Sequence, residues 1–233
     1  SRTDLPLTIA GVPVTLLAEG GVLLPDANTL LIGDLHLGRA RTMQRAGVGL
    51  PSGGDDDDLG RVEALVRRSG ARRLILLGDV VHARSGVGTE LASALRRLGA
   101  AAPGGVRAVP GNHDGAYLAE AAAGSGVRVT GRRLRVAGVE LTHAPRTRAP
   151  SATAPLRIAA HLHPAVALHG SVDRLRVPAF LLRDRELILP AFGRTAAGAP
   201  RTPSARERLF AATGTRVVEI ARSGRPRMGR PRT

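Results

Sequence analysis

The sequence predicts an α/β protein. Short apolar runs recur along the first 160 residues, helical patterns lie between the early runs, and most runs end in a small cluster of polar residues. Apolar runs of about four to eight residues bounded by Gly or Pro are typical of buried strands. Alternation of such strands with helices is typical of α/β folds. The 233 residues are enough for one large domain, and we expect it to span residues 1–222.

The first element is an apolar stretch at residues 7–18 that has two interpretations. Its hydrophobicity is compatible with a signal peptide, but Gly11 and Pro13 interrupt it and its flanking charge is weak. A β-hairpin leading into Gly20 and Gly21 fits as well. We favour the hairpin and a cytoplasmic protein. No apolar run approaches the roughly 18 residues of a membrane span.

The next elements are strands that end in polar residues, with helices between them. Helices are predicted at 59–68, at 89–98 with Thr89 as the cap, and at 115–123. The strands are 29–33 followed by Asp34 and His36, 73–78 followed by Asp79 and His82, 106–109 followed by Asn112, His113 and Asp114, 138–142 followed by His143, and 156–160 followed by His161 and His163. Loops after strand carboxyl ends form the ligand site in open α/β sheets, so we expect these side chains to lie together.

The second half changes character from about residue 127. Short strands in series, including 174–190 and a last strand at 216–221, predict a second and more antiparallel sheet. Residues 223–233 form a basic Pro/Gly tail that we expect to be disordered.

Charge and composition restrict the chemistry. The formal net charge is +15 and all 34 basic residues are arginine. A bias toward GC-rich codons explains arginine in place of lysine, but it does not explain the excess of base over acid. That excess indicates a polyanionic partner such as nucleic acid. Only four residues are Phe, Tyr or Trp, so such binding would run mainly through phosphates. Without cysteine, a metal site must use His, carboxylate and amide ligands.

The polar clusters also form an ordered set of motifs. They read Asp34-Leu35-His36, Gly78-Asp79, Gly111-Asn112-His113-Asp114, His143 and His161-Leu162-His163. Taken alone, residues 109–115 could be a simple turn. The full set resembles the signature of the calcineurin-like metallophosphoesterases over roughly residues 20–195. Stretches such as "GDLHLGRARTMQRAGVGLPSGG", "LLGDVVHA" and "HLHPAV" are similar to the ligase-associated DNA damage response endonucleases of that superfamily.

The resemblance implies a four-layer αββα sandwich of two mixed β-sheets flanked by helices, with two divalent metal ions. Two such ions can lower the pKa of a bridging water and neutralise phosphate oxygens. Asp79 would bridge them. One ion would take Asp34, His36, Asp79 and His163, and the other would take Asp79, Asn112, His143 and His161. A sulfur-free set of O and N ligands suits Mn²⁺, Fe²⁺ or Zn²⁺, and the family preference indicates Mn²⁺.

The same resemblance implies roles for the loop at 111–114. Asn112 would bind a metal and contact phosphate, His113 would protonate the leaving group, and Asp114 would orient the imidazole. Arg39 is either a phosphate clamp or part of a solvated helix face. His82 would orient a ligand or contact substrate.

Other features have simpler interpretations. Asp55–Asp58 favours a solvated loop and helix cap over a metal site, and His169 is expected to be structural or exposed. Ala160 departs from the usual Gly-His-x-His motif, and a position that needed positive φ would be strained by alanine.

Three functions remain open from the sequence. The leading one is a Mn²⁺-dependent endonuclease acting on DNA in repair, with an ATP-dependent DNA ligase and a DEAD/DEAH-type helicase as partners implied by the resemblance. A phosphoesterase for a small nucleotide would share the same metal core. A non-catalytic nucleic-acid-binding module is disfavoured by the complete ligand set.

Overall fold

The amino-terminal part of the chain forms a seven-stranded sheet whose strands follow one another in chain order. The structure is a computed structural model that describes residues 2–49, 53–83, 88–115, 117–169, 174–196 and 198–221. The strands are β1 (Leu5–Ile9), β2 (Val12–Leu16), β3 (Val22–Leu24), β4 (Thr29–Gly33), β5 (Arg73–Leu77), β6 (Val106–Val109) and β7 (Val127–Val129). β1 to β4 pair antiparallel and β4 to β7 pair parallel. The predicted amino-terminal hairpin is confirmed as β1 and β2.

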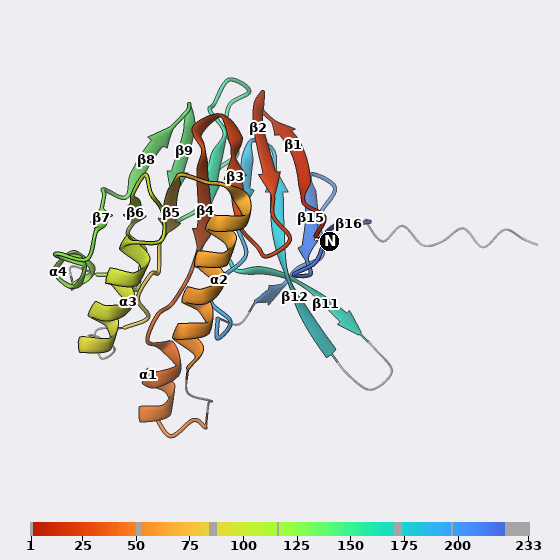
Figure 1. The fold of residues 1–233 in the computed structure, drawn as a ribbon. Helices are drawn as coiled ribbons and strands as arrows, with labels where there is room; N and C mark the ends of the chain where they lie inside the picture. Colours follow the sequence, from red (N-terminus) through yellow and green to blue (C-terminus); the bar gives the residue numbers. More distant parts are fainter. Residues whose placement is uncertain are drawn as a thin grey trace, which may run out of the picture.

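The helices lie beside this first sheet, where α2 and α3 run side by side (Figure 1). They are the short 3-10 helix η1 (Pro25–Ala27), α1 (Arg39–Arg45), α2 (Gly54–Ser69), α3 (Thr89–Gly99) and α4 (Tyr117–Ala122). Three predicted helices are confirmed, whereas α1 was not predicted. Thr89 is the first helical residue, so Gly88 and not Thr89 occupies the capping position. None of the described helices is long and apolar enough to span a membrane.

The acidic run Asp55–Asp58 belongs to α2 and not to a solvated loop. The Asp55 carboxylate accepts the Gly38 N–H at 2.9 Å, and Asp58 accepts the Arg194 N–H at 3.0 Å. Burial raises the pKa of both carboxyls. These side chains therefore connect α2 to α1 and to the segment around Arg194.

The central strands are buried on both faces, which explains their continuous apolar runs. Leu30 and Ile32 of β4 face a core shared with the helices, whereas Leu31 faces a core shared with a second sheet. That second core contains Ile158 and Phe180. Alternation of neighbouring residues between the two cores follows from the two-residue period of a strand.

The second sheet is built from the carboxyl-terminal half. Its strands are β8 (Arg133–Val136), β9 (Val139–Thr142), β10 (Arg157–Ala159), β11 (Pro164–His169), β12 (Arg174–Arg183), β13 (Glu186–Ile188), β14 (Ala199–Pro200), β15 (Glu207–Ala212) and β16 (Val217–Ile220). The order is β14-β11-β12-β13-β10-β9-β8, with β15 pairing β12 and β16. β10 pairs parallel with β9 and β13, so the sheet is mixed.

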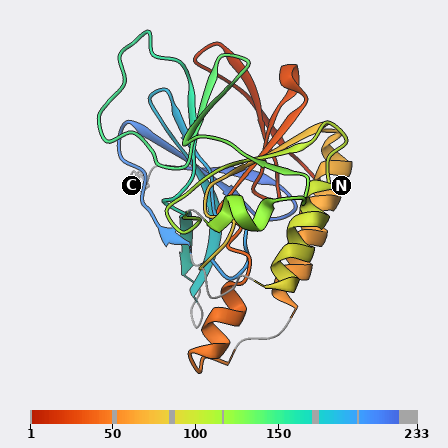
Figure 2. The same cartoon turned by 90° about the vertical axis from the view of Figure 1, so that its left-hand side faces the viewer.

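The structure confirms the α/β class and two mixed sheets, with two differences in detail. β7 pairs with β6, so residues 127–129 end the first sheet and do not open the second. Helices α2 and α3 lie along one side of the molecule (Figure 2), and within the described ranges all α-helices precede β7. The expected second helical layer is therefore not seen in that part of the chain. The tail at 223–233 lies outside the described residues.

Alanine at position 160, where the family motif usually has glycine, is accommodated by Gly33 in the other sheet. Ala160 is fully buried and is not among the residues with positive φ, so the expected strain does not arise. A Cβ on Gly33 of β4 would lie 2.7 Å from the Ala160 Cβ. Gly33 therefore leaves the space that the Ala160 methyl group fills between the two sheets.

This contact predicts a coupled pair of substitutions. Gly33→Ala should destabilise the fold by about 1–3 kcal/mol, because two rigid methyl groups would overlap. Gly33→Ala combined with Ala160→Gly should recover most of that loss. Urea unfolding of both single variants and the double variant measures the coupling. Additive losses would show that the two positions do not compete for the same space.

Candidate metal centre

Two groups of potential metal-binding side chains lie where the two sheets meet. One group is Asp34, His36 and His163, and the other is Asp79, His143 and His161. Within each group the ligand atoms lie within 4.8 Å of one another. Asp34, His36 and Asp79 follow β4 and β5 of the first sheet, whereas the other histidines follow β9 and β10 of the second.

Asp79 lies between the two groups. Its Oδ2 is 3.4 Å from the His143 Nε2 and 3.9 Å from the His36 Nε2. Asp34 also approaches both groups, since its Oδ1 is 3.5 Å from the His143 Nδ1 and its Oδ2 is 3.4 Å from the His163 Nε2. The six side chains therefore form one continuous cluster, as expected from the sequence.

The donor atoms of this cluster fit divalent cations. Asp34 Oδ1, both ring nitrogens of His36 and the His143 Nε2 are buried and find no hydrogen-bond partner among the described residues. Buried polar atoms in proteins are nearly always paired, and pairing with a metal ion would satisfy these atoms. Burial lowers the pKa of His36 to about 3 and also lowers the pKa of His161. Neutral imidazoles beside carboxylates are the form that binds metal.

Backbone conformation also sets this cluster apart. Nine non-glycine residues in the described part of the chain have positive φ. Five of the nine belong to the cluster, namely Asp34, His36, Asp79, His161 and His163. Left-handed backbone at such residues costs on the order of 1–3 kcal/mol each and is concentrated at functional sites. The backbone is therefore strained at the residues that orient these side chains toward the cluster.

Two glycines allow the loops of the centre to approach each other. A Cβ on Gly78 would lie 2.1 Å from the His143 Nδ1, and Gly78 itself has a φ of +73°. A Cβ on Gly111 would lie 2.3 Å from the Asp79 backbone nitrogen. Both positions therefore require glycine, which explains why the Gly-Asp and Gly-Asn-His-Asp sequences begin with it.

The loop at 111–114 places its three polar residues differently. Asn112 and His113 are exposed, whereas Asp114 is fully buried. The His113 N–H donates to the Asp79 Oδ1 at 2.8 Å, and its imidazole lies outside both donor groups. Asn112 lines a cavity together with His143, next to the second group.

The role expected for Asp114 is corrected by this geometry. Its two oxygens accept the backbone N–H groups of Gly111 at 2.7 Å and Val81 at 2.9 Å. The His113 Nδ1 instead lies 3.0 Å from the His82 carbonyl oxygen. A carbonyl only accepts, so the Nδ1 carries a proton and the Nε2 faces away from that bond. Asp114 therefore holds the loop, and the His82 backbone orients the imidazole.

His82 and Arg39 lie beside this loop. The His82 ring stacks on His113 with centroids 5.3 Å apart, and His36 meets both rings edge-on. Burial lowers the pKa of His82, and the nearby positive charge of Arg39 adds to that effect. His82 thus contacts the cluster directly, and Arg39 lies close to His82. The side chain of His169 lies outside the described residues.

A cavity of about 570 Å³ opens beside Asn112 and His143. Apart from these two residues, the sequence did not single out the residues that line it. Five of them are arginines, namely Arg132, Arg133, Arg146, Arg148 and Arg157. The available signal was the dense arginine on both sides of His143 in "GRRLRV" and "PRTRAP", but arginine is frequent throughout the chain.

The fold and the site together place the protein in the class of metallophosphoesterases. The chain belongs to the calcineurin-like phosphoesterase family, because the family model matches residues 27–170, more than half of the chain. This range includes both donor groups. The protein is thus a hydrolase of that family, with candidate sites for divalent metal ions.

A solved structure adds a second comparison. The crystal structure of nuclease MPE from Pseudomonas putida is similar, with a TM-score of 0.73 and 27% sequence identity. The similarity covers 94% of this chain and 100% of that one. No protein among those with curated descriptions matches the chain.

Proposed function

We propose that this protein is a dinuclear, Mn²⁺-dependent phosphodiesterase that cleaves DNA as an endonuclease in repair. The polymer substrate is supported by the net charge of +15 and by the similarity to a nuclease. The resemblance to ligase-associated endonucleases supports an ATP-dependent ligase and a DEAD/DEAH-type helicase as partners. The proposal keeps the cytoplasmic location expected from the sequence.

The position of Asp79 is the observation that carries this proposal. One carboxylate oxygen lies within 3.9 Å of a histidine from each donor group. A carboxylate can bind two cations at once, so Asp79 is the proposed bridge. Asp34, His36 and His163 would complete one site, and Asn112, His143 and His161 the other. When bound, two such ions would activate water and stabilise negative charge on the phosphate.

The residues around the ions would position the substrate and move a proton. His113 is exposed, is not in either donor group, and is held at its Nδ1 by the His82 carbonyl. With Nδ1 already donating to that carbonyl, the Nε2 would supply a proton to the leaving oxygen of the substrate from the charged, doubly protonated imidazolium. Asp114 would keep this loop in place through its bonds to Gly111 and Val81. Arg39 can donate two parallel hydrogen bonds to a phosphate beside the centre.

A panel of metals and substrates tests the proposed function. Protein treated with chelator should be inactive on single-stranded DNA, duplex DNA and bis-p-nitrophenyl phosphate. Mn²⁺ should restore the highest rates, compared with Mg²⁺, Zn²⁺ and Fe²⁺ at equal concentration. Full activity in excess chelator would contradict a metal-dependent mechanism. Restored hydrolysis of the small diester without DNA cleavage would favour a small-nucleotide enzyme.

A further inference from the structure

The cavity beside Asn112 and His143 carries a strong excess of positive charge. Its lining contains the five arginines named above and no acidic side chain. It is formed by residues before and within β8, by the segment that follows β9, and by Arg157 of β10. The metal centre thus opens directly onto an arginine-lined space.

Two buried carboxylates lie beneath these arginines, and Glu186 accepts the Arg146 backbone N–H at 2.8 Å. Glu140 is buried and accepts hydrogen bonds from Arg157 at 2.9 and 3.0 Å and from Arg146 at 3.4 Å. The Arg133 Nη1 lies 3.8 Å from the same carboxylate, and the Arg133 side chain is 75% exposed. Two negative charges therefore fix the base of the group, which is fewer than its five arginines.

Arg132 and Arg148 have even fewer partners. Both are exposed, and neither has a hydrogen bond or ion pair with another described residue. Their guanidinium groups are available to bind an anion. Arginine suits phosphate because its planar fork of N–H donors matches two phosphate oxygens.

A second large cavity, by contrast, has acidic residues beside its arginines. The cavity between α1, α2 and α3, of about 470 Å³, is also lined by arginines. There Arg41 pairs with Glu90, and Arg97 pairs with Asp56. A lining with arginines and no acidic residue therefore distinguishes the cavity beside the metal centre from this one.

We infer that this arginine groove, formed by Arg132, Arg133, Arg146, Arg148 and Arg157, binds the phosphate backbone of a nucleic-acid strand leading away from the metal centre. The inference rests on the proposed function and identifies the path of its substrate. A single phosphate at the metal centre would leave these guanidinium groups unused, whereas a strand places further phosphates beside them. No Phe, Tyr or Trp lines the groove, so binding should be insensitive to base sequence.

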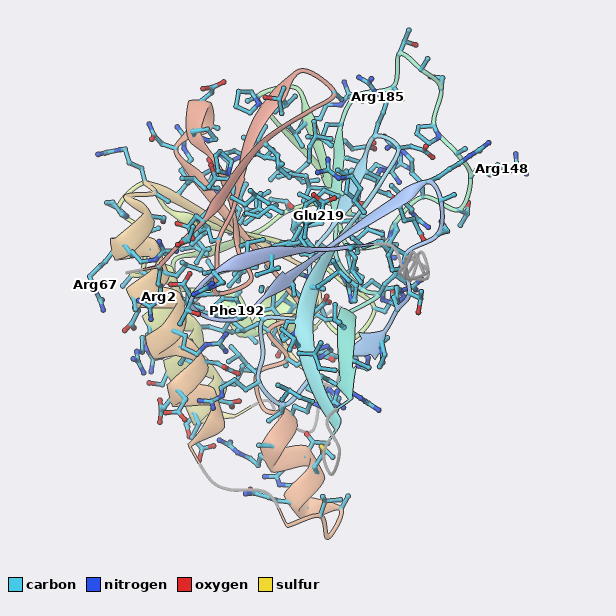
Figure 3. All side chains as sticks on the ribbon, turned by 90° about the vertical axis from the view of Figure 1, so that its right-hand side faces the viewer. Arg2, Arg67, Arg148, Arg185, Phe192 and Glu219 are labelled. Carbon is cyan, nitrogen blue, oxygen red and sulfur yellow. The ribbon has the colours of Figure 1, made fainter. Side chains whose placement is uncertain are left out.

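Direct binding measurements test the groove without relying on catalysis. We would measure the affinity of a fluorescent thymidine oligonucleotide by anisotropy in excess chelator, from 50 to 200 mM salt. The groove variant is Arg132→Gln, Arg133→Gln and Arg148→Gln in one chain. The matched control is Arg67→Gln, Arg72→Gln and Arg96→Gln, which removes the same charge. Figure 3 shows Arg67 and Arg148 on opposite sides of the molecule.

The expected effect follows from counterion release. Each phosphate contact on a single strand contributes about −0.7 to the log–log slope of affinity against salt, so three lost contacts should reduce its magnitude by about 2. Wild-type protein should then lose roughly 18-fold more affinity than the groove variant over the fourfold change in salt. The control variant should follow the wild type.

Hydrolysis of bis-p-nitrophenyl phosphate with Mn²⁺ separates this inference from the proposed function. The groove variant should keep the wild-type rate on this small diester. Equal salt slopes for the groove variant and the wild type would overturn the inference, as would equal losses in the groove and control variants. A parallel fall in diester hydrolysis would show that the arginines support the metal centre. If wild-type protein fails to hydrolyse the diester with any metal, the proposed function fails, whatever the binding result.

Discussion

Replacement of Asp79 by asparagine should remove nearly all phosphodiesterase activity and reduce the amount of bound metal. The Asp79 Oδ2 lies between His36 and His143, one from each donor group. An amide at this position cannot bridge two cations as a carboxylate does. The loss should exceed the roughly 10–100-fold typical of residues that only orient a ligand.

Asparagine is more informative than alanine at this position. The Asp79 Oδ1 also accepts the His113 N–H, and an amide oxygen can keep that bond. Loss of activity in Asp79→Asn thus reports on the bridge more than on the loop. Asp26→Ala is a matched control, because Asp26 is an exposed carboxylate on η1, and it should leave activity and metal content unchanged. Two ions bound with normal affinity in Asp79→Asn would contradict the bridging role.

Replacement of His113 by alanine should leave metal content unchanged while it slows DNA cleavage strongly. The imidazole lies outside the donor groups, and its proposed role is to give a proton to a sugar oxygen, which leaves poorly as an alkoxide. General acid catalysis typically contributes about 10²–10⁴-fold, and DNA cleavage should fall by that factor. A p-nitrophenolate leaves without a proton, so hydrolysis of the aryl diester should fall much less.

Tyr117→Phe is the control for this prediction. The Tyr117 hydroxyl donates to the His113 carbonyl oxygen, so this variant alters the surroundings of the loop but not the imidazole. Both of its rates should stay near those of the wild type. Metal loss in His113→Ala would show that the imidazole is a ligand. Equal slowing of both substrates would show that it contacts phosphate and does not supply the proton.

Local sequence patterns were sufficient to predict the strands that carry the centre. β4 and β6 begin and end where the apolar runs at 29–33 and 106–109 do. Burial on both faces makes such strands apolar throughout, and their ends are marked by glycine and polar residues. The six side chains that the structure brings together were also predicted, because they follow these strands directly.

Other features depend on partners that are distant in the chain. Helix α1 was missed, and its amino-terminal Gly38 N–H is bound by Asp55, which lies in another helix. β7 was assigned to the wrong sheet, because the residues of a strand do not determine which other strand it pairs with. Asp114 was expected to orient the His113 imidazole, whereas its oxygens accept two backbone N–H groups and the imidazole lies against the His82 carbonyl.

The sequence by itself determined which residues are apolar, where the buried strands end and which chemical groups follow them, because hydrophobic period and burial are local properties of the chain. Only the tertiary structure decided that Gly33 makes room for Ala160, that Asp79 lies between two donor groups, and that arginines from β8, β10 and the segment after β9 share one groove. Each of these depends on distances of a few ångströms between segments that are far apart in sequence, and packing of the two sheets sets those distances.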